Sequence, residues 1–276
     1  MVQPHDSVQR KSSRLVDVCD AVVSVLFPAG CRLCERLLTR ASRVPICELC
    51  LASFEPLQGR TCEICGATFQ ASFGEPGPDT EGESGAGSDR RICRVCTSRP
   101  YAFERARSYA QYQEALVRAI VTLKFERIEP LGKWFAHRLA ELVQAEPELL
   151  EADIVVPVPL HRQRLRERGY NQADLIGKPL ARLLGLPYRA VLLTRTRPRP
   201  DKHILSSRER WESVRGAFAT RPGSQVDNLR VLLVDDVMTT GATLDACSKA
   251  LRVAGAKSVV AVTVARAVLH PAADSV

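Results

Sequence analysis

Eight of the ten cysteines in this 276-residue chain form four Cys-x-x-Cys pairs, all within the first 96 residues. Two residues between thiolates let one tight turn present both sulfurs to the same metal ion. Two such turns complete a tetrahedral Zn–S4 site. The four pairs therefore predict two structural zinc sites, each filled by four protein ligands and without an open position for a substrate. The pairs are Cys31/Cys34, Cys47/Cys50, Cys62/Cys65 and Cys93/Cys96.

The spacing leaves the order of pairing open. In a sequential arrangement the first two pairs share one ion and the last two pairs share the other. In an interleaved arrangement each ion is bound by two pairs that are not neighbours in the sequence. One Cys-x-x-Cys pair alone is also typical of redox sites, but four pairs so close together favour metal binding. Cys19 and Cys247 stand alone in helical patterns, and we expect both to be small buried core residues.

A second group of chemically suggestive residues lies at 231–243, which reads VLLVDDVMTTGAT. The apolar run 231–234 predicts a buried strand that ends at Asp235 and Asp236, and ligands of open parallel sheets bind outside the carboxyl ends of the strands. The segment TTGAT then opens a helix, where backbone N–H groups, hydroxyls and a glycine suit a phosphate. The adjacent carboxylates suit the neighbouring hydroxyls of a sugar phosphate, one acid to each.

A purely structural interpretation of 231–243 is a strand with an acidic end followed by a capped helix. It does not explain why two acids, two threonines and a glycine occur together. The segment is also not a Walker loop, because no Gly-Lys-Ser/Thr follows.

The elements around this segment alternate between helix and strand. Alternation of this kind predicts an α/β fold with a parallel sheet covered by helices on both faces. Apolar residues recur at helical spacing over 115–123, 131–143, 173–184 and 243–254. Short apolar runs predict strands over 153–156, 191–193, 231–234 and 258–264.

Composition suggests three parts. Residues 1–27 contain an amphipathic helical pattern, 28–100 contain the double zinc ribbon, and 101–276 form the α/β domain. Within the ribbon, 70–91 is rich in Gly, Ser, Pro and acids and predicts a flexible loop. Apolar residues make up 45% and charged residues 25% of the chain, as in ordinary globular proteins. No apolar run approaches the length of a membrane span, so we expect a cytoplasmic protein.

The net charge of +8 is concentrated in one region: residues 151–222 hold 15 Lys and Arg against 7 Asp and Glu. This excess is either a solvated surface or a basic rim around an anionic ligand, because local positive potential concentrates phosphates. No aromatic residues alternate with these arginines, which argues against a stacking groove for single strands but allows contacts to a phosphate backbone.

Two segments resemble known proteins. Residues 231–243 match the phosphoribosyl pyrophosphate (PRPP) signature of type I phosphoribosyltransferases. The four Cys-x-x-Cys pairs together with VPVPLHRQRLRERGYNQA at 156–173 resemble the ComF family within that fold. The resemblance implies a type I phosphoribosyltransferase-like parallel sheet flanked by helices, with a small N-terminal zinc-ribbon module and a mobile loop over the site.

The resemblance also assigns candidate residues. Asp235 and Asp236 would hold the ribose hydroxyls, and Arg168 and Arg210 match family arginines, the latter within a mobile region at 194–218. Apart from the resemblance, Lys124, which follows a helical pattern, is a further candidate for phosphate contact; its alternative is a surface lysine beside a buried Phe. The pyrophosphate loop would be Val158, Pro159 and Leu160. The 5-phosphate segment would comprise Val237, Met238, Thr239, Thr240, Gly241, Ala242 and Thr243.

Three functions remain open at this level. The first is a Mg²⁺-dependent phosphoribosyltransferase that acts on PRPP with an acceptor the residues do not specify. The second is a non-catalytic module that binds PRPP or a related sugar phosphate as a regulatory signal. The third, which the ComF resemblance implies, is association with single-stranded DNA in bacterial DNA uptake and competence.

Overall fold

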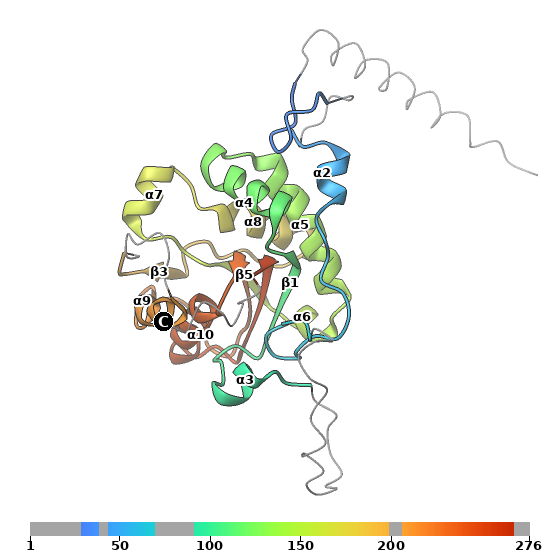
Figure 1. Ribbon diagram of the computed structural model, residues 1–276. Helices are drawn as coiled ribbons and strands as arrows, with labels where there is room; N and C mark the ends of the chain where they lie inside the picture. The colour runs from blue at the N-terminus through green and yellow to red at the C-terminus, as the bar shows by residue number, and fades with distance from the viewer. Residues whose placement is uncertain (1–28, 39–43, 70–90, 199–205, 268–276) are drawn as a thin grey trace, which may run out of the picture.

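The central sheet is formed by the apolar runs that alternate with helices along the chain. The computed structural model describes residues 29–38, 44–69, 91–198 and 206–267. Four strands pair in parallel in the order β1-β6-β5-β2 (Figure 1). Their bounds are β1 (Arg105–Gln111), β2 (Ile154–Pro157), β5 (Arg230–Met238) and β6 (Ser258–Arg266).

Helices connect these strands and cover both faces of the sheet. The described helices are α2 (Glu48–Ala52), α3 (Arg94–Ser98), α4 (Glu114–Glu126), α5 (Glu129–Gln144), α6 (Pro147–Leu150), α7 (Arg162–Arg168), α8 (Gln172–Leu184), α9 (Ser207–Val214) and α10 (Ala242–Val253). One hydrophobic cluster packs α4, α5 and α8 against one face, and a second packs α10 against the other. The predicted α/β fold, with a parallel sheet covered on both faces, is confirmed.

Strand β5 is longer than the apolar run suggested. It continues to Met238, so both acids lie within the strand and not beyond its end. The reason lies in its neighbours. β2 stops at Pro157, opposite Val234, whereas β6 runs on and pairs with β5 as far as Met238.

Strand β1 was not expected from the sequence, because RARSYAQ contains arginines and a serine instead of an apolar run. Tertiary contacts satisfy these polar groups. The hydroxyl groups of Ser108 and Thr263 in the paired strand β6 lie 2.7 Å apart, and the guanidinium of Arg107 is bound to several oxygen atoms.

The segment at 194–218 contains regular structure in its described part. The strand expected at 191–193 is instead β3 (Leu193–Arg195), which pairs antiparallel with β4 (Phe218–Thr220) outside the main sheet. Helix α9 lies between them and begins with a capping box, in which the Ser206 side chain accepts from the backbone N–H of Glu209. Short strands of this kind depend on their partner for stability.

Three predictions fall outside the described residues: the helix within 1–27, the environment of Cys19, and the loop at 70–91 except its last residue. Among the helices that are described, none combines the length and hydropathy of a membrane span.

Candidate functional site

The candidate site is centred on the turn between β5 and α10. Residues 239–243, here called the phosphate loop, lead from the end of the strand into the first turn of the helix. Gly241 has φ +77°, a conformation that side chains disfavour. A Cβ atom placed there would lie 2.9 Å from both Met238 Cε and Tyr101 Cε1. The loop therefore requires glycine both for its backbone conformation and for close packing.

The two acids of β5 point to opposite faces of the sheet, because successive side chains of a strand alternate. Asp236 faces α4, where its Oδ2 lies 2.9 Å from Nζ of Lys124 and has no access to solvent. Asp235 faces α10 and β3, where its charge interacts with Cys247 and Arg195. The pair therefore does not present two equivalent carboxylates on one surface.

Burial and a neighbouring negative charge shift the pKa of Asp235. Burial, with a further contribution from the Asp236 charge, raises the pKa of Asp235 to about 7. Burial alone would lower the pKa of Lys124, but the carboxylates of Asp236 and Asp235 raise it above its ordinary value. Lys124 is therefore charged and paired with Asp236, whereas Asp235 can hold a proton near neutral pH.

Arg168 joins this group from the end of α7. Its guanidinium lies over the ring of Phe125, 5.3 Å from the ring centroid, and donates to the side chain of Gln172. Burial lowers the pKa of Arg168, although the nearby Asp236 charge opposes the change. The structure thus brings Lys124, Asp236 and Arg168 together from α4, β5 and α7, three elements far apart in the sequence.

The residues after Arg168 connect the elements around this group. Gly169, at φ +77°, ends α7, and the Tyr170 hydroxyl donates to the carbonyl of Leu123, 2.7 Å away, at the end of α4. Asn171 caps α8 and donates from Nδ2 to the carbonyl of Val158 at 3.0 Å. This segment therefore holds α4 and the loop after β2 at fixed positions beside β5.

The pyrophosphate-loop candidates leave the sheet next to the acids. The backbone N–H of Val158 donates to the carbonyl of Val234, 2.9 Å away, and Val158 is buried while Pro159 and Leu160 are half-buried. The loop is therefore anchored at the residue that directly precedes Asp235.

Other candidates occupy different places. Met238 is buried and Val237 is partly buried; both lie within β5 and pack in the hydrophobic clusters. Arg210 lies on α9, the helix that packs against α10. The arginine whose charge acts on Asp235 is Arg195 of β3, which the sequence offered only as one of many basic residues. Cys247 is fully buried in the core, as predicted.

The eight paired cysteines form two groups in sequential order. Sulfur atoms of different Cys-x-x-Cys turns lie 3.7 Å apart in each group. This distance matches the edge of about 3.8 Å expected for a tetrahedron with Zn–S bonds of about 2.3 Å. The donor sets therefore fit zinc. The first cysteine cluster contains Cys31, Cys34, Cys47 and Cys50, and the second contains Cys62, Cys65, Cys93 and Cys96.

The two clusters lie against opposite faces of the sheet. The first packs with α4 and α5, and the second packs with the β5, β6 and α10 cluster, so α2 and α3 are far apart (Figure 1). Within residues 28–100, the two cysteine clusters therefore pack in different hydrophobic clusters of the protein.

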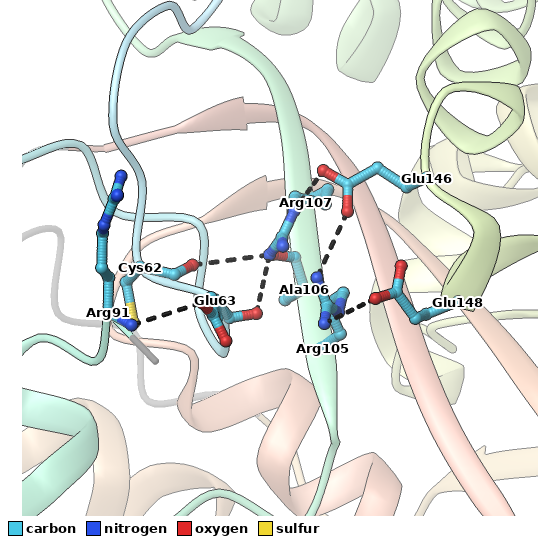
Figure 2. Close-up of polar contacts among 8 residues, drawn as sticks. All are labelled: Cys62, Glu63, Arg91, Arg105, Ala106, Arg107, Glu146 and Glu148. Carbon is cyan, nitrogen blue, oxygen red and sulfur yellow. Dashed lines mark hydrogen bonds and ion pairs between the residues drawn. The ribbon is translucent and has the colours of Figure 1, made fainter. Parts of the chain in front are cut away.

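Arg107 of β1 anchors the second cysteine cluster to the sheet (Figure 2). Its Nη1 donates to the carbonyl oxygens of Glu63 and Ala106 at 3.0 and 2.9 Å, and its Nε donates to Glu146 at 2.8 Å. The side chain is only 8% exposed. The sequence did not predict this role for Arg107, because strand β1 was not expected and an arginine outside a predicted element is normally assigned to the surface.

Comparison with known proteins shows similarity over most of the chain. Residues 175–273 match the phosphoribosyl transferase domain family. DNA utilization protein YhgH of Salmonella typhi is 30% identical over 235 residues, which cover 84% of this chain and 94% of that protein. Competence protein F of Haemophilus influenzae is 31% identical over 183 residues, which cover 63% of this chain and 78% of that protein.

Among solved structures, the chain is similar to a glutamine PRPP amidotransferase from B. subtilis, with 26% identity and a TM-score of 0.34. The aligned region covers 49% of this chain and 26% of that enzyme. A similarity of this extent carries no argument about function.

Proposed function

Because this chain belongs to the ComF family of proteins with a phosphoribosyl transferase domain, we propose that its site binds PRPP with Mg²⁺ and transfers the 5-phosphoribosyl group to an acceptor. The observation that carries the proposal is the arrangement around β5. A loop that requires glycine leads into a helix N-terminus and follows Asp236, which is paired with the partly buried Lys124 and whose charge acts on Arg168. Such an arrangement offers donors for a phosphate and an acceptor for a sugar hydroxyl in adjacent positions.

The phosphate loop supplies the donors for the 5-phosphate. Thr239 and Thr243 are partly exposed, so their hydroxyls can reach a ligand, while the Thr240 hydroxyl accepts from the backbone N–H of Ala242 at 3.3 Å. The N-terminus of the twelve-residue helix α10 favours the negative charge of the phosphate. The loop is thus preorganised for an anion.

The two acids have different roles in this proposal. Both acids are buried: Asp236, paired with Lys124, would accept a hydrogen bond from a ribose hydroxyl, and Asp235 lies on the other face of the strand. Mg²⁺ is commonly bound by one or two carboxylates together with substrate phosphates, so this donor set fits an ion that arrives with PRPP. When bound, Mg²⁺ would neutralise charge on the pyrophosphate.

In the transfer step, the bond between C1 of the ribose and the pyrophosphate oxygen breaks, and its electron pair leaves with pyrophosphate. A lone pair of the acceptor forms the new bond to C1, and the proton of the acceptor is lost to solvent. In this proposal Arg168 and Lys124 would stabilise the leaving charge, because cationic donors in a partly buried site act more strongly than in water.

The binding proposal is tested by calorimetric titration of PRPP and Mg²⁺ against wild type, Asp236→Asn and Asp235→Asn. Loss of a charged hydrogen-bond acceptor should weaken binding by about 10- to 100-fold for Asp236→Asn. We expect a smaller effect for Asp235→Asn. Wild-type affinity in Asp236→Asn would contradict the assignment. Pyrophosphate release measured over a panel of amine and base acceptors separates an enzyme from a module that only binds PRPP.

We further propose that both cysteine clusters hold structural Zn²⁺. Each cluster offers four sulfurs at tetrahedral spacing and leaves no position for a substrate. Eight thiolate ligands require reduced cysteines, which agrees with a protein of the cytoplasm. Metal analysis of the purified protein should give two zinc ions per chain.

A second candidate function is association with single-stranded DNA. It is favoured by the names of the relatives, a DNA utilization protein and a competence protein, and by the exposed arginines Arg162, Arg164 and Arg166 on α7. Contacts between arginines and phosphates release counterions, so the affinity for an oligonucleotide should fall steeply as salt increases. An affinity independent of salt would contradict this mode of binding.

A further inference from the structure

The segment that leaves the second cysteine cluster runs directly to the phosphate loop. Cys96 lies in α3, and Tyr101 follows shortly after the end of that helix. The Tyr101 hydroxyl donates to the carbonyl oxygen of Thr240, 2.8 Å away. Two segments separated by 139 residues in the sequence are therefore in direct contact at the centre of the candidate site.

This hydrogen bond controls the orientation of one peptide group in the loop. The Thr240–Gly241 peptide is planar, so a carbonyl held toward Tyr101 directs the Gly241 N–H to the opposite side. The ring of Tyr101 also covers Gly241 so closely that a Cβ atom there would lie 2.9 Å from Cε1. Tyr101 thus restrains the loop both through its hydroxyl and through its ring.

The residues around Tyr101 hold it in place. Its ring stacks on Phe103, with centroids 4.5 Å apart, and lies 5.8 Å from that of Trp211 in α9. The next residue, Ala102, donates its backbone N–H to Asp245 Oδ1 at 2.8 Å, and Asp245 lies in the first turn of α10. The segment after the cluster is therefore attached to the loop, to the helix that follows it and to α9.

The second cysteine cluster is itself attached to the sheet. Arg107 binds the carbonyl of Glu63, within the turn between Cys62 and Cys65, and the Cys93 N–H donates to the Cys62 sulfur at 3.3 Å. A metal ion at this cluster would join the turn that Arg107 holds to α3. The path from the sheet through the cluster to the phosphate loop is then continuous.

We propose that Tyr101 is a positioning residue for the phosphate loop and that the metal-loaded second cysteine cluster sets the affinity of this loop for the 5-phosphate. The proposal rests on the proposed function of the site. The first cysteine cluster packs on the other face of the sheet and takes no part in this coupling. The two clusters thus differ in function although their ligands are the same.

The first test compares Tyr101→Phe with Tyr109→Phe. Both variants lose only a tyrosine hydroxyl, and Tyr109 lies in β1 with its ring against Trp134, on the side of the first hydrophobic cluster. Ribose 5-phosphate and PRPP with Mg²⁺ are titrated by calorimetry. We expect Tyr101→Phe to weaken binding of both ligands about 3- to 10-fold, as for one lost neutral hydrogen bond, and Tyr109→Phe to leave binding unchanged.

Hydrogen exchange of the amides at 239–243 provides a readout that does not depend on ligand binding. Faster exchange in Tyr101→Phe, with no change in Tyr109→Phe, is the expected result. If wild type fails to bind PRPP, the proposed function is wrong, while faster exchange still supports the positioning role. Unchanged exchange and unchanged affinity in Tyr101→Phe would overturn the inference.

The second test separates the two clusters. Cys96→Ser removes a ligand of the second cysteine cluster, and Cys34→Ser removes one from the first. Exchange at 239–243 and affinity for ribose 5-phosphate should change in Cys96→Ser alone. Equal effects of the two variants, or an effect of neither, would show that the second cluster is not coupled to the loop.

Discussion

Replacement of Arg107 by methionine should strongly destabilise the protein and loosen the second cysteine cluster. The change keeps much of the apolar stem but removes every hydrogen bond of the guanidinium. The carbonyls of Glu63 and Ala106 lose their donors, and the carboxylate of Glu146 loses its 2.8 Å partner. Each buried acceptor left without a donor costs about 1 kcal/mol or more.

Two features limit the loss of unfolding free energy that arises at Glu146. Its side chain is 26% exposed, and it keeps an ion pair with Arg105 at 3.4 Å. We therefore take about 1 kcal/mol for this carboxylate and a similar amount for each carbonyl, which predicts a loss of about 3 kcal/mol in the free energy of unfolding.

Arg105→Met provides the matched control. Arg105 lies on the same strand and pairs with Glu146 and the more exposed Glu148, but its own side chain is 22% exposed. Partly exposed pairs of this kind contribute about 1 kcal/mol or less. Both variants are measured by urea unfolding, together with the rate of zinc release to a chromogenic chelator.

The two variants should differ in both measurements. Arg107→Met should lower the unfolding free energy much more than Arg105→Met and should release one zinc ion faster than wild type. Equal losses in the two variants, or unaltered zinc release in Arg107→Met, would refute the view that Arg107 anchors the cluster.

Three further predictions concern the site and its metals. In wild type, the raised pKa of Asp235 means that the folded protein binds this proton more tightly than the unfolded chain does. A stabilisation of at most about 4 kcal/mol should therefore be lost as pH rises from about 4 to about 7. Urea unfolding of Asp235→Asn at pH 5 and pH 8 should not show this loss of stability. Gly241→Ala should destabilise the protein more than Gly169→Ala in thermal unfolding, because both residues have φ +77° but only the first substitution adds contacts of 2.9 Å with Met238 and Tyr101. A strong chelator should remove zinc in two phases. The first cysteine cluster should lose its ion first, because one of its cysteines is exposed; release in a single phase would contradict this order.

Much of the architecture was accessible from local patterns. Helices α4, α5, α8 and α10 follow from apolar residues at helical spacing, and β2 and β6 follow from apolar runs. Strand β1 was not predicted, because its polar residues, although several are buried, give the sequence pattern of a surface segment. The end of β5 was placed too early because the extra strand length depends on pairing with β6, which no local pattern records.

In the candidate site, too, some features could be predicted from local sequence and others depend on tertiary contacts. The acids and the phosphate loop are contiguous in the chain, so their types and spacing were enough to propose them. The pairing of Lys124 with Asp236, the charge of Arg195 on Asp235 and the contact of Tyr101 with Thr240 join residues from separate elements. Such pairs depend on the arrangement of elements and leave no signal of their own.

By itself, the sequence determined the four Cys-x-x-Cys pairs, the α/β class and the segment proposed as the phosphate loop, because each depends on spacing within a short segment. The tertiary structure decided the sequential grouping of the cysteines, the opposite faces occupied by Asp235 and Asp236, and the separation of the two clusters across the sheet. These features depend on which distant segments pack together. Burial, hydrogen bonding and charge pairing settle that packing over the whole fold.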